Sequence, residues 1–412
     1  MRAFLKQFRF EVLLIIVGLS TLVVADFFLQ MSSQTMIFPD SDNYLVAAKN
    51  LMVYHRGHDY RPIVMSFIYG FPYLFGATDA QVYTFSFYIN LVAWLATTIL
   101  IFQICKTIVK PKTAFLFTLI FYTSVGTFTL LYHLLSENMY TLFIVLALFF
   151  TLKYYQSKRF LYLSFALSVL ICSMLIRPGS KWLAIVFSLY FAKILYQNYA
   201  HKAMLFIYGS WLLVAVQCAG LYYQFGNFTI SYIDSVTYYN YIGSKAMCLK
   251  EGKDYQQIDN PRANVLLHLK TRDEIVKVAK ADLIEQLKNN KVNLLKAYLY
   301  DVYDNTVSGS ATVATLENKK NTTFFEASKT VFFFISTWQN RLLTLLGVVL
   351  ALYYFYKNYK TEVFFAMIST YVLYIVAVSG ISSTQGDRFH LVFFPIVIIL
   401  SVKLFKEKQW IN

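Results

Sequence analysis

Charged residues are scarce in this chain of 412 residues: Asp, Glu, Lys and Arg make up 14% of it, whereas 58% is hydrophobic. Soluble globular domains carry about 25% charged residues, so this composition excludes an ordinary soluble protein and predicts a membrane protein. The 33 tyrosines and 38 phenylalanines suit interfacial belts and lipid-facing surfaces.

Cysteines are also few, and their spacing excludes two common kinds of scaffold. Cys105, Cys172 and Cys218 fall in or beside apolar runs, where cysteine behaves as a small hydrophobe. None of these or Cys248 forms a C-x-x-C pair, which argues against a disulfide framework and against a structural zinc site.

A concentrated basic segment is missing despite a formal net charge of +15. No block of lysine and arginine with interleaved aromatics stands apart from the apolar runs, so nucleic acid is not an expected partner. Arg2, Lys6 and Arg9 precede an apolar run from Val12 to Leu29 that has no convincing cleavage site of small residues. We therefore expect a retained first span instead of a signal peptide.

Long apolar runs are what the chain has in abundance. A membrane-spanning helix needs about 20 apolar residues, and several shorter runs could span if they tilt or join interfacial helices. The sequence predicts an all-α polytopic bundle of about ten spans. They are 10–30, 84–105, 113–131, 139–155, 160–176, 182–196, 204–223, 341–356, 363–379 and 391–405.

The distribution of cations predicts the orientation of these spans, because cytoplasmic loops collect lysine and arginine. With both termini cytoplasmic, the inner loops and the C-terminal tail hold most of the cations, and the short outer loops hold few. The inner set is Lys106, Lys110, Lys112, Lys153, Lys158, Arg159, Lys193, Lys202, Lys357, Lys360, Lys403, Lys406 and Lys408. An integral, multi-pass location follows, with the bacterial inner membrane as the expected one.

Two long outer segments divide the chain. A first loop over 31–83 belongs to an N-terminal membrane module, 1–223, and a second segment over 224–340 precedes a C-terminal membrane module, 341–412. No internal repeat and no low-complexity linker is visible.

The second outer segment carries signals for short helices. Thr271 to Glu274 has the pattern of a capping box and precedes an apolar period. A second helix is expected over 292–303 and a loop over 308–315. The stretch 324–338 reads as interfacial and could run into the eighth span.

Polar residues that could carry chemistry share the outer ends of the predicted spans. They are Asp40, Asp42, Arg61, His133, Glu137, Arg177, Asp387, Arg388 and His390. Acids at a membrane edge are expensive to keep without a role. Two interpretations stay open for several of them: Glu137 could simply favour a helix N-terminus, and Arg177 could either snorkel to headgroups or clamp an anion.

In this order the residues resemble a known family. The elements are Asp40-Ser41-x-x-Tyr44, Ala47-Ala48, Leu51, Arg61-Pro62, Phe75-Gly76, Ser136-Glu137, Leu175-Ile176-Arg177-Pro178 and Asp387-Arg388-Phe389 with Pro395. Together they are similar to the GT-C glycosyltransferases, in particular the protein O-mannosyltransferase and aminoarabinose transferase branches. Each element is short, but they cover most of the chain in the expected order.

The resemblance implies an integral membrane glycosyltransferase that uses a polyprenyl-phosphate sugar as donor and a hydroxyl of a glycan, lipid or protein as acceptor, with inversion at the anomeric carbon. It implies Asp40 as the base, Asp42 as a residue that orients the acceptor or raises the basicity of Asp40, and Glu137 as the second-loop acid. Arg177 and Arg388 would stabilise the leaving phosphate. The remaining expected substrate-binding residues are Tyr44, Arg61, His133, Asp387 and His390.

Some features depart from the family. Its first loop usually carries Asp-Glu, whereas this chain has Asp40-Ser41, and ten spans is a low count for it. The branches resembled do not generally require a metal, although Asp40, Asp42 and Glu137 could make an oxygen-rich site for Mg²⁺ or Mn²⁺. No Trp-Trp-Asp motif is present, which disfavours transfer of a whole oligosaccharide to asparagine.

Other functions stay open. An envelope polysaccharide polymerase or ligase would also present basic residues in large outer loops, and Arg262 and Arg272 lie in one. A transporter of lipid-linked sugar would be expected to show two matching halves and broken or charged helices at the midplane. The spans here show almost no ionisable residue in their interiors.

Overall fold

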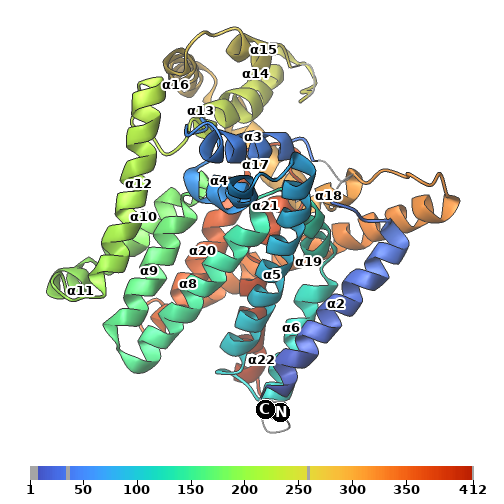
Figure 1. Ribbon diagram of the computed structural model, residues 1–412, viewed down its shortest axis with the longest axis vertical. Coiled ribbons are helices and arrows are strands. Elements are labelled where there is room, and N and C mark those ends of the chain that lie inside the picture. The colour runs from blue at the N-terminus through green and yellow to red at the C-terminus, as the bar shows by residue number, and fades with distance from the viewer. Residues whose placement is uncertain (1–7, 34–37, 258–259, 411–412) are drawn as a thin grey trace.

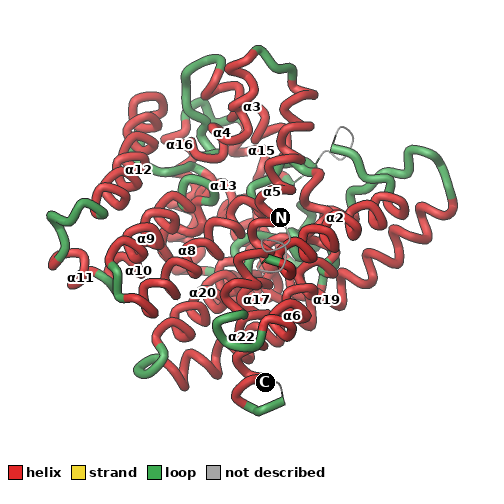
Figure 2. The backbone as a smooth tube through the Cα atoms, turned by 60° about the horizontal axis from the view of Figure 1, so that its bottom comes forward, coloured by secondary structure: helices red, strands yellow, loops and turns green. Residues whose placement is uncertain are grey.

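The computed structural model describes residues 8–33, 38–257 and 260–410. These residues form helices and connecting loops with no strand among them (Figure 2). The all-helical class predicted from the sequence is therefore confirmed. Arg2 and Lys6, which belong to the predicted cytoplasmic N-terminus, lie outside the described residues.

Five of the described helices are long and apolar enough to cross a membrane. They are α2 (Arg9–Leu29), α5 (Asp79–Cys105), α8 (Glu137–Ser157), α12 (Met204–Phe225) and α19 (Thr323–Asn358). Much of their apolar surface is uncovered by protein, as Val23 of α2 and Leu205 of α12 illustrate. Exposed apolar helix faces of this length fit a lipid environment, which supports the prediction of a membrane protein.

The predicted count of ten spans is not confirmed. Four of the predicted spans correspond to α9 (Phe160–Ser173), α10 (Lys181–Tyr190), α20 (Val363–Ser379) and α22 (Phe394–Glu407). Each is shorter than the roughly 20 residues that cross a bilayer without help. Hydropathy counts apolar residues but does not register where a helix ends, and these four end early.

A sixth candidate span is broken. Helix α6 (Pro111–Thr123) is bent by 65° from the following segment, which comprises α7 (Val125–Thr129) and η2 (Leu130–Tyr132). Gln339 of α19 bridges the break: its Oε1 accepts from the Val125 N–H at 2.9 Å, and its Nε2 donates to the Thr123 carbonyl at 2.6 Å. Backbone groups that a break releases inside an apolar layer need such partners.

Local sequence explains where the main helices begin and end. Thr78 starts α5 with a capping box, because its hydroxyl accepts from the Gln81 N–H while the Gln81 side chain accepts from the Thr78 N–H at 2.7 Å. Helix α6 begins at Pro111, a favourable residue for a first helical position. Helix α12 ends at Gly226, whose φ of 86° suits glycine.

Short helices gather at one end of the long ones, opposite the end at which α2 begins and α22 stops (Figure 1). The first loop supplies α3 (Ser41–Met52), α4 (Ile63–Gly70) and η1 (Phe71–Phe75). The second segment supplies α13 (Ile233–Tyr238), the π-helical turn η4 (Tyr239–Gly243), α14 (Ser244–Glu251), α15 (Pro261–Leu267), α16 (Arg272–Asn289), α17 (Lys291–Val307) and α18 (Ala311–Ala314). The remaining elements are η3 (Pro178–Ser180), α11 (Ala192–Gln197) and α21 (Arg388–Leu391).

Most local predictions for the second segment are confirmed. Thr271 and Glu274 form the capping box of α16, the helix expected over 292–303 lies within α17, and 324–338 forms one continuous helix, α19, with the predicted eighth span. The loop expected over 308–315 is wrong in part, since 311–314 forms the single turn α18. Two alanines in that turn favour the helical conformation.

Packing follows the same division. A large cluster of buried apolar side chains runs through the long helices and takes in residues of α3 and α4 from the first loop. The second segment has two small clusters of its own, one around Tyr239, Leu266 and Ile275 and the other around Ile242 and Ala297. The short helices are therefore a packed cap over the ends of the long ones.

Candidate functional site

Five charged side chains from distant parts of the sequence meet beneath this cap, and we call them the arginine cluster: Asp40, Arg61, Glu137, Arg177 and Arg388. Asp40 directly precedes α3, Arg61 lies just before α4, and Glu137 is the first residue of α8. Arg177 directly precedes η3, and Arg388 begins α21. All five occupy helix ends or the loops beside them.

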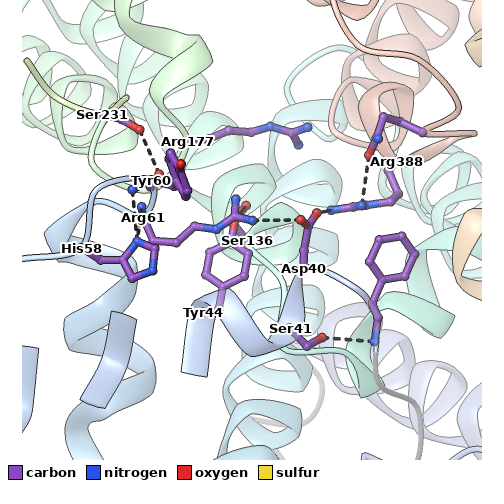
Figure 3. A network of polar contacts seen from close by, with 12 residues as sticks. Asp40, Ser41, Tyr44, His58, Tyr60, Arg61, Ser136, Arg177, Ser231 and Arg388 are labelled. Atoms are coloured by element: carbon purple, nitrogen blue, oxygen red, sulfur yellow. Dashed lines mark hydrogen bonds and ion pairs between the residues drawn. The ribbon is translucent and has the colours of Figure 1, made fainter. Parts of the chain in front are cut away.

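Asp40 lies between two guanidinium groups, as Figure 3 shows. Its Oδ1 is 2.9 Å from Nη2 of Arg61, and its Oδ2 is 3.1 Å from Nη2 of Arg388. The Asp40 side chain keeps 36% of its surface exposed, so a reactant can still reach this carboxylate.

Glu137 is the buried partner of the same arginine. Its Oε1 is 2.8 Å from Nη2 and 3.0 Å from Nε of Arg388, and only 2% of its side chain is exposed. Nη1 of Arg177 approaches the same oxygen to 3.7 Å, which is an ion pair too long for a hydrogen bond. Arg388 thus joins the two carboxylates.

Aromatic rings hold the three guanidinium groups in place. Arg388 stacks 4.2 Å from the centre of the Phe38 ring, Arg61 lies 4.3 Å from that of Tyr44, and Arg177 lies 4.6 Å from that of Phe389. Contacts of this kind fix a cation by attraction to the ring face.

The ring of Tyr44 is itself held in place. Its hydroxyl donates to Oγ of Ser136 at 2.8 Å, immediately before Glu137 in the sequence. Tyr44, expected to bind substrate, therefore contributes to the cluster by supporting the Arg61 guanidinium.

The cluster is not electrically balanced. Three guanidinium groups face two carboxylates, which leaves one positive charge. Within the described part of the chain, Nη1 of Arg177, Nε of Arg61 and Oε2 of Glu137 are buried without a hydrogen-bond partner. Buried polar groups are normally satisfied, so the two arginine nitrogens indicate a site that an additional anion would complete, whereas the Glu137 oxygen needs a donor.

Electrostatics keep Asp40 ionised. Burial acts to raise the pKa of its carboxyl group, but the charges of Arg388 and Arg61, and their hydrogen bonds, outweigh burial and hold the pKa below its usual value. Asp40 is therefore a carboxylate at neutral pH, as a proton acceptor must be.

Four of the residues expected at the site lie outside the cluster. Asp42 is exposed, and its Oδ1 accepts from the Tyr83 hydroxyl at 3.3 Å. Residues two positions apart do not face each other on a helix, so the first turn of α3 directs Asp42 away from Asp40. The close approach of the two acids expected from the sequence is not what the structure shows.

Asp387 and His390 are buried on the side of α21 that faces the body of the protein. Oδ1 of Asp387 accepts from the Ala311 N–H at 3.3 Å. Nδ1 of His390 lies 3.0 Å from Oγ1 of Thr344 and 3.1 Å from Oδ1 of Asn340. Both therefore anchor the turn that presents Arg388 and do not enter the cluster.

His133 is buried, and its ring meets the edge of the Phe38 ring with 5.9 Å between centres. Phe38 is the ring that covers Arg388. His133 thus lies behind the cluster, separated from the guanidinium group by an aromatic side chain.

Several contributors were missed by sequence reasoning. Oε1 of Gln385 accepts from Nη1 of Arg388 at 3.1 Å. Tyr241 of the second segment lies within range of the charges of Asp40, Arg388 and Arg61. Nε2 of Gln257 lies 3.5 Å from the Tyr241 hydroxyl, and the Gln257 side chain also binds that of Thr384. No spacing or motif marks these residues, because their proximity to Asp40 depends on how the cap folds.

A metal centre receives no support from the geometry. In the ranges that the structure describes, no three His, Cys, Asp or Glu residues are grouped so that they could hold a metal ion. Asp40 and Glu137 both contact Arg388, and Asp42 points elsewhere.

Comparison of the chain with family models, curated proteins and solved structures found no match.

Proposed function

We propose that this chain is an integral membrane glycosyltransferase that moves a sugar from a polyprenyl-phosphate donor to an acceptor hydroxyl at the outer face of the membrane, with Asp40 as the base. The observation that carries the proposal is an ionised, partly exposed carboxylate that lies within 3.1 Å of two guanidinium groups. These groups belong to a cluster with one more positive than negative charge. A base and an anion-binding group are the two parts that such a transfer needs.

The arginines suit the leaving group. As the bond between the anomeric carbon and the phosphate oxygen breaks, negative charge grows on the phosphate, and fixed guanidinium groups stabilise that charge. Arg388 and Arg61 are held by ring contacts and ion pairs, and Arg177 has a buried N–H group free for an added oxygen. Little reorganisation would then be needed when the donor binds.

Donor binding also prepares the base. A phosphate that takes hydrogen bonds from Arg61 and Arg388 competes with Asp40 for the same donors. As those contacts weaken, the proton affinity of the carboxylate rises, because they hold its pKa low. Asp40 then accepts the proton of the acceptor hydroxyl as the oxygen attacks the anomeric carbon from the face opposite the phosphate, which inverts the configuration.

The architecture proposed with this function is a GT-C-like bundle in which the shorter helices α9, α10, α20 and α22 also cross the membrane. Both ends of the chain would face the cytoplasm of a bacterial cell, and the cap would face the opposite side. The lysines and arginines at the loops that join the long helices away from the cap support this orientation.

The test compares Asp40→Asn with Asp79→Asn. Both changes remove one carboxylate charge, but Asp79 pairs with Lys49 at 2.7 Å outside the arginine cluster. Purified variants in lipid nanodiscs would be given a radiolabelled polyprenyl-phosphate hexose and a membrane extract as the acceptor source. Asp40→Asn should lose transfer while keeping the wild-type melting temperature, and Asp79→Asn should retain transfer. Wild-type turnover by Asp40→Asn would remove Asp40 from the mechanism.

Transport of the lipid-linked sugar is the second candidate, and the 65° break between α6 and α7 favours it, because broken helices are common in transporters. In sealed vesicles a transporter would move the intact donor across the bilayer, whereas a transferase would leave free polyprenyl phosphate. The chemical form of the lipid after the reaction therefore separates the two.

A further inference from the structure

A large cavity lies beside the arginine cluster. It has a volume of about 810 Å³ and is bounded by the end of α12, the first loop, η4, α15 and the start of α16. Its size is comparable to ligand sites in proteins, which run from about 300 to 1,000 Å³. The proposed transfer places its chemistry at the cluster and leaves this cavity unassigned.

At two places, consecutive residues of the chain separate the cavity from the arginine cluster. Tyr60 lines the cavity, and the next residue, Arg61, binds Asp40. Asn240 lines the cavity, and the next residue, Tyr241, lies within range of the charges of Asp40, Arg388 and Arg61. Burial raises the pKa of Tyr241 and the charge of Asp40 adds to the effect, as expected for a phenol close to that carboxylate. A ligand in the cavity would therefore be separated from the arginine cluster by the chain at Tyr60–Arg61 and Asn240–Tyr241.

One side of the cavity is apolar. Leu266 and Leu267 of α15, Ile275 of α16 and Val236 of α13 line it, and Phe225 closes it at the end of α12. Leu267 is 79% exposed, so this apolar surface is uncovered. Because α12 is one of the candidate spans, the apolar side opens where a membrane helix ends.

The other side is cationic. Lys270 and Arg272 line it, and none of the described lining residues is acidic. Arg272 is fixed by an ion pair of 2.7 Å with the buried Asp59 and by the Tyr60 ring at 5.4 Å. The Lys270 side chain forms no ion pair in the described part of the chain and can take one from a ligand.

Asn240 adds a polar atom without a partner. Its Oδ1 is buried and accepts no hydrogen bond from any described residue. A hydroxyl group on the ligand would satisfy it. The N–H groups at the start of α16, by contrast, are already used by the capping box of Thr271 and Glu274.

We propose that the cavity binds an amphiphile that carries an apolar chain and an anionic, hydroxyl-bearing headgroup. The chain lies along the leucines of α15, the anionic group meets Lys270 and Arg272, and the hydroxyl meets Asn240. This inference rests on the proposed function in one respect: there the amphiphile is the acceptor, reaching the arginine cluster past Tyr60 and Tyr241. The binding itself can be tested without any transfer.

The probe is phosphatidylglycerol with a diazirine on its acyl chain, which is anionic and bears hydroxyls. The full chain in nanodiscs would be irradiated and the labelled peptides identified by mass spectrometry. We expect label on α15 and the start of α16, and about tenfold less from an equal amount of diazirine phosphatidylcholine. That lipid keeps the phosphate but replaces the hydroxyl-bearing glycerol with a cationic choline, which loses the hydroxyl contact and is repelled by Lys270 and Arg272. Equal labelling by both lipids would overturn the proposal.

Variants separate the cavity from general lipid contact. Lys270→Gln should reduce the α15 label about tenfold, whereas Lys280→Gln, which removes an exposed charge on α16 outside the cavity, should not. Ala263→Trp fills the cavity from α15 and should abolish the label without changing labels on α12. Unchanged α15 labelling in Ala263→Trp would show that the lipid contacts the outside of the helix only.

Two more arms identify the source of the anion and separate this inference from the proposed function. Inorganic phosphate should not displace the label, and full displacement would show a site for a free anion in place of an amphiphile. Asp40→Asn should bind phosphatidylglycerol as the wild type does. Normal labelling with no transfer by the wild type would sink the transferase while leaving the cavity as a lipid site. Normal transfer by Asp40→Asn would only remove Asp40 from the mechanism.

Discussion

The arginine cluster and a second group of charged side chains, of which only Asp304 is substantially exposed, differ in how they are balanced. The second group, which we call the lysine cluster, consists of Lys245, Asp301 and Asp304. Nζ of Lys245 lies 2.6 Å from Asp301 and 3.0 Å from Asp304, and Oγ of Ser383 donates to Asp301 at 2.8 Å. Here acids outnumber cations, whereas in the arginine cluster cations outnumber acids.

The two clusters shift their acids in opposite directions. Burial raises the pKa of Asp301, because one lysine does not offset the loss of water. Burial also acts to raise the pKa of Asp40, but two guanidinium groups outweigh it. Asp301 has no exposed surface, while Asp40 has 36%. An excess of cations next to an accessible acid suits binding and reaction; a closed acid with a single cation suits structural support.

The lysine cluster supports the turn between α20 and α21. Ser383 belongs to the turn between α20 and α21, and Asn305 of α17 donates to the carbonyls of Ser379 and Ser382 in that turn at 2.9 and 2.7 Å. The turn leads to Arg388. The lysine cluster therefore ties the cap to the loop that delivers an arginine to the other cluster.

The largest effect is expected from Arg388→Ala, which removes the residue that joins Asp40 and Glu137. Transfer should fall about 100-fold or more, because a cation that stabilises the leaving phosphate is lost. The free energy of unfolding should fall by about 3 kcal/mol, because Glu137 stays buried with a weakened partner. Turnover assays and chemical denaturation in detergent measure both. Transfer at the wild-type rate would show that the arginine cluster does not take part in the reaction.

Lys245→Met should cost stability and spare the chemistry. It leaves Asp301 buried without its cation, which should lower the free energy of unfolding by about 2 kcal/mol. Adding Asp301→Asn should recover part of that loss, because the uncompensated charge disappears. Transfer per folded molecule should stay near the wild-type rate. A variant that folds as stably as the wild type but cannot transfer would show that the lysine cluster belongs to the reaction.

Asp387 provides a pH test. Burial raises its pKa to about 7 in the folded chain, from 3.8 when free. Between these values the unfolded chain has released the proton and the folded chain has kept it, so this residue makes stability fall as pH rises. The slope contributed is up to about 1.4 kcal/mol per pH unit.

The measurement is the difference between Asp387→Asn and wild type in free energy of unfolding, taken from pH 4.5 to 7. Taking the difference cancels other groups, including His58, whose pKa burial lowers to about 4 and which acts with the opposite sign. The difference should change steadily in favour of the variant as pH rises. A constant difference would show that Asp387 ionises normally.

The smallest effect is expected from Thr78→Ala, which belongs to neither cluster. It removes the capping box of α5 and should cost about 1 kcal/mol of stability without affecting transfer. Its free energy of unfolding and its turnover, measured together with those of the other variants, make Thr78→Ala the reference for a purely structural loss of stability. A loss of transfer here would mean that any destabilisation lowers activity, and the contrast between the clusters would lose its support.

Local features of this protein could be predicted from its sequence. The apolar runs correspond to α2, α5, α8, α12 and the second half of α19, and the capping box of α16 was visible in four residues. Helix formation and burial in lipid depend on neighbours within a few turns, which a sequence displays directly. The ends of α9, α10, α20 and α22 depend on tertiary packing, so the predicted count of ten spans is not confirmed by the lengths of the described helices.

The sequence by itself predicted a helical membrane protein with acids and arginines gathered near the ends of its helices. Only the tertiary structure decided that Asp40 meets Arg61 and Arg388 while Asp42 turns towards Tyr83. The physical reason is directional: each residue of a helix points about 100° away from the one before it, so charges two positions apart diverge, while charges 348 positions apart can meet. The sequence therefore indicates that the charges lie near helix ends, but the packing of those ends determines which charges pair.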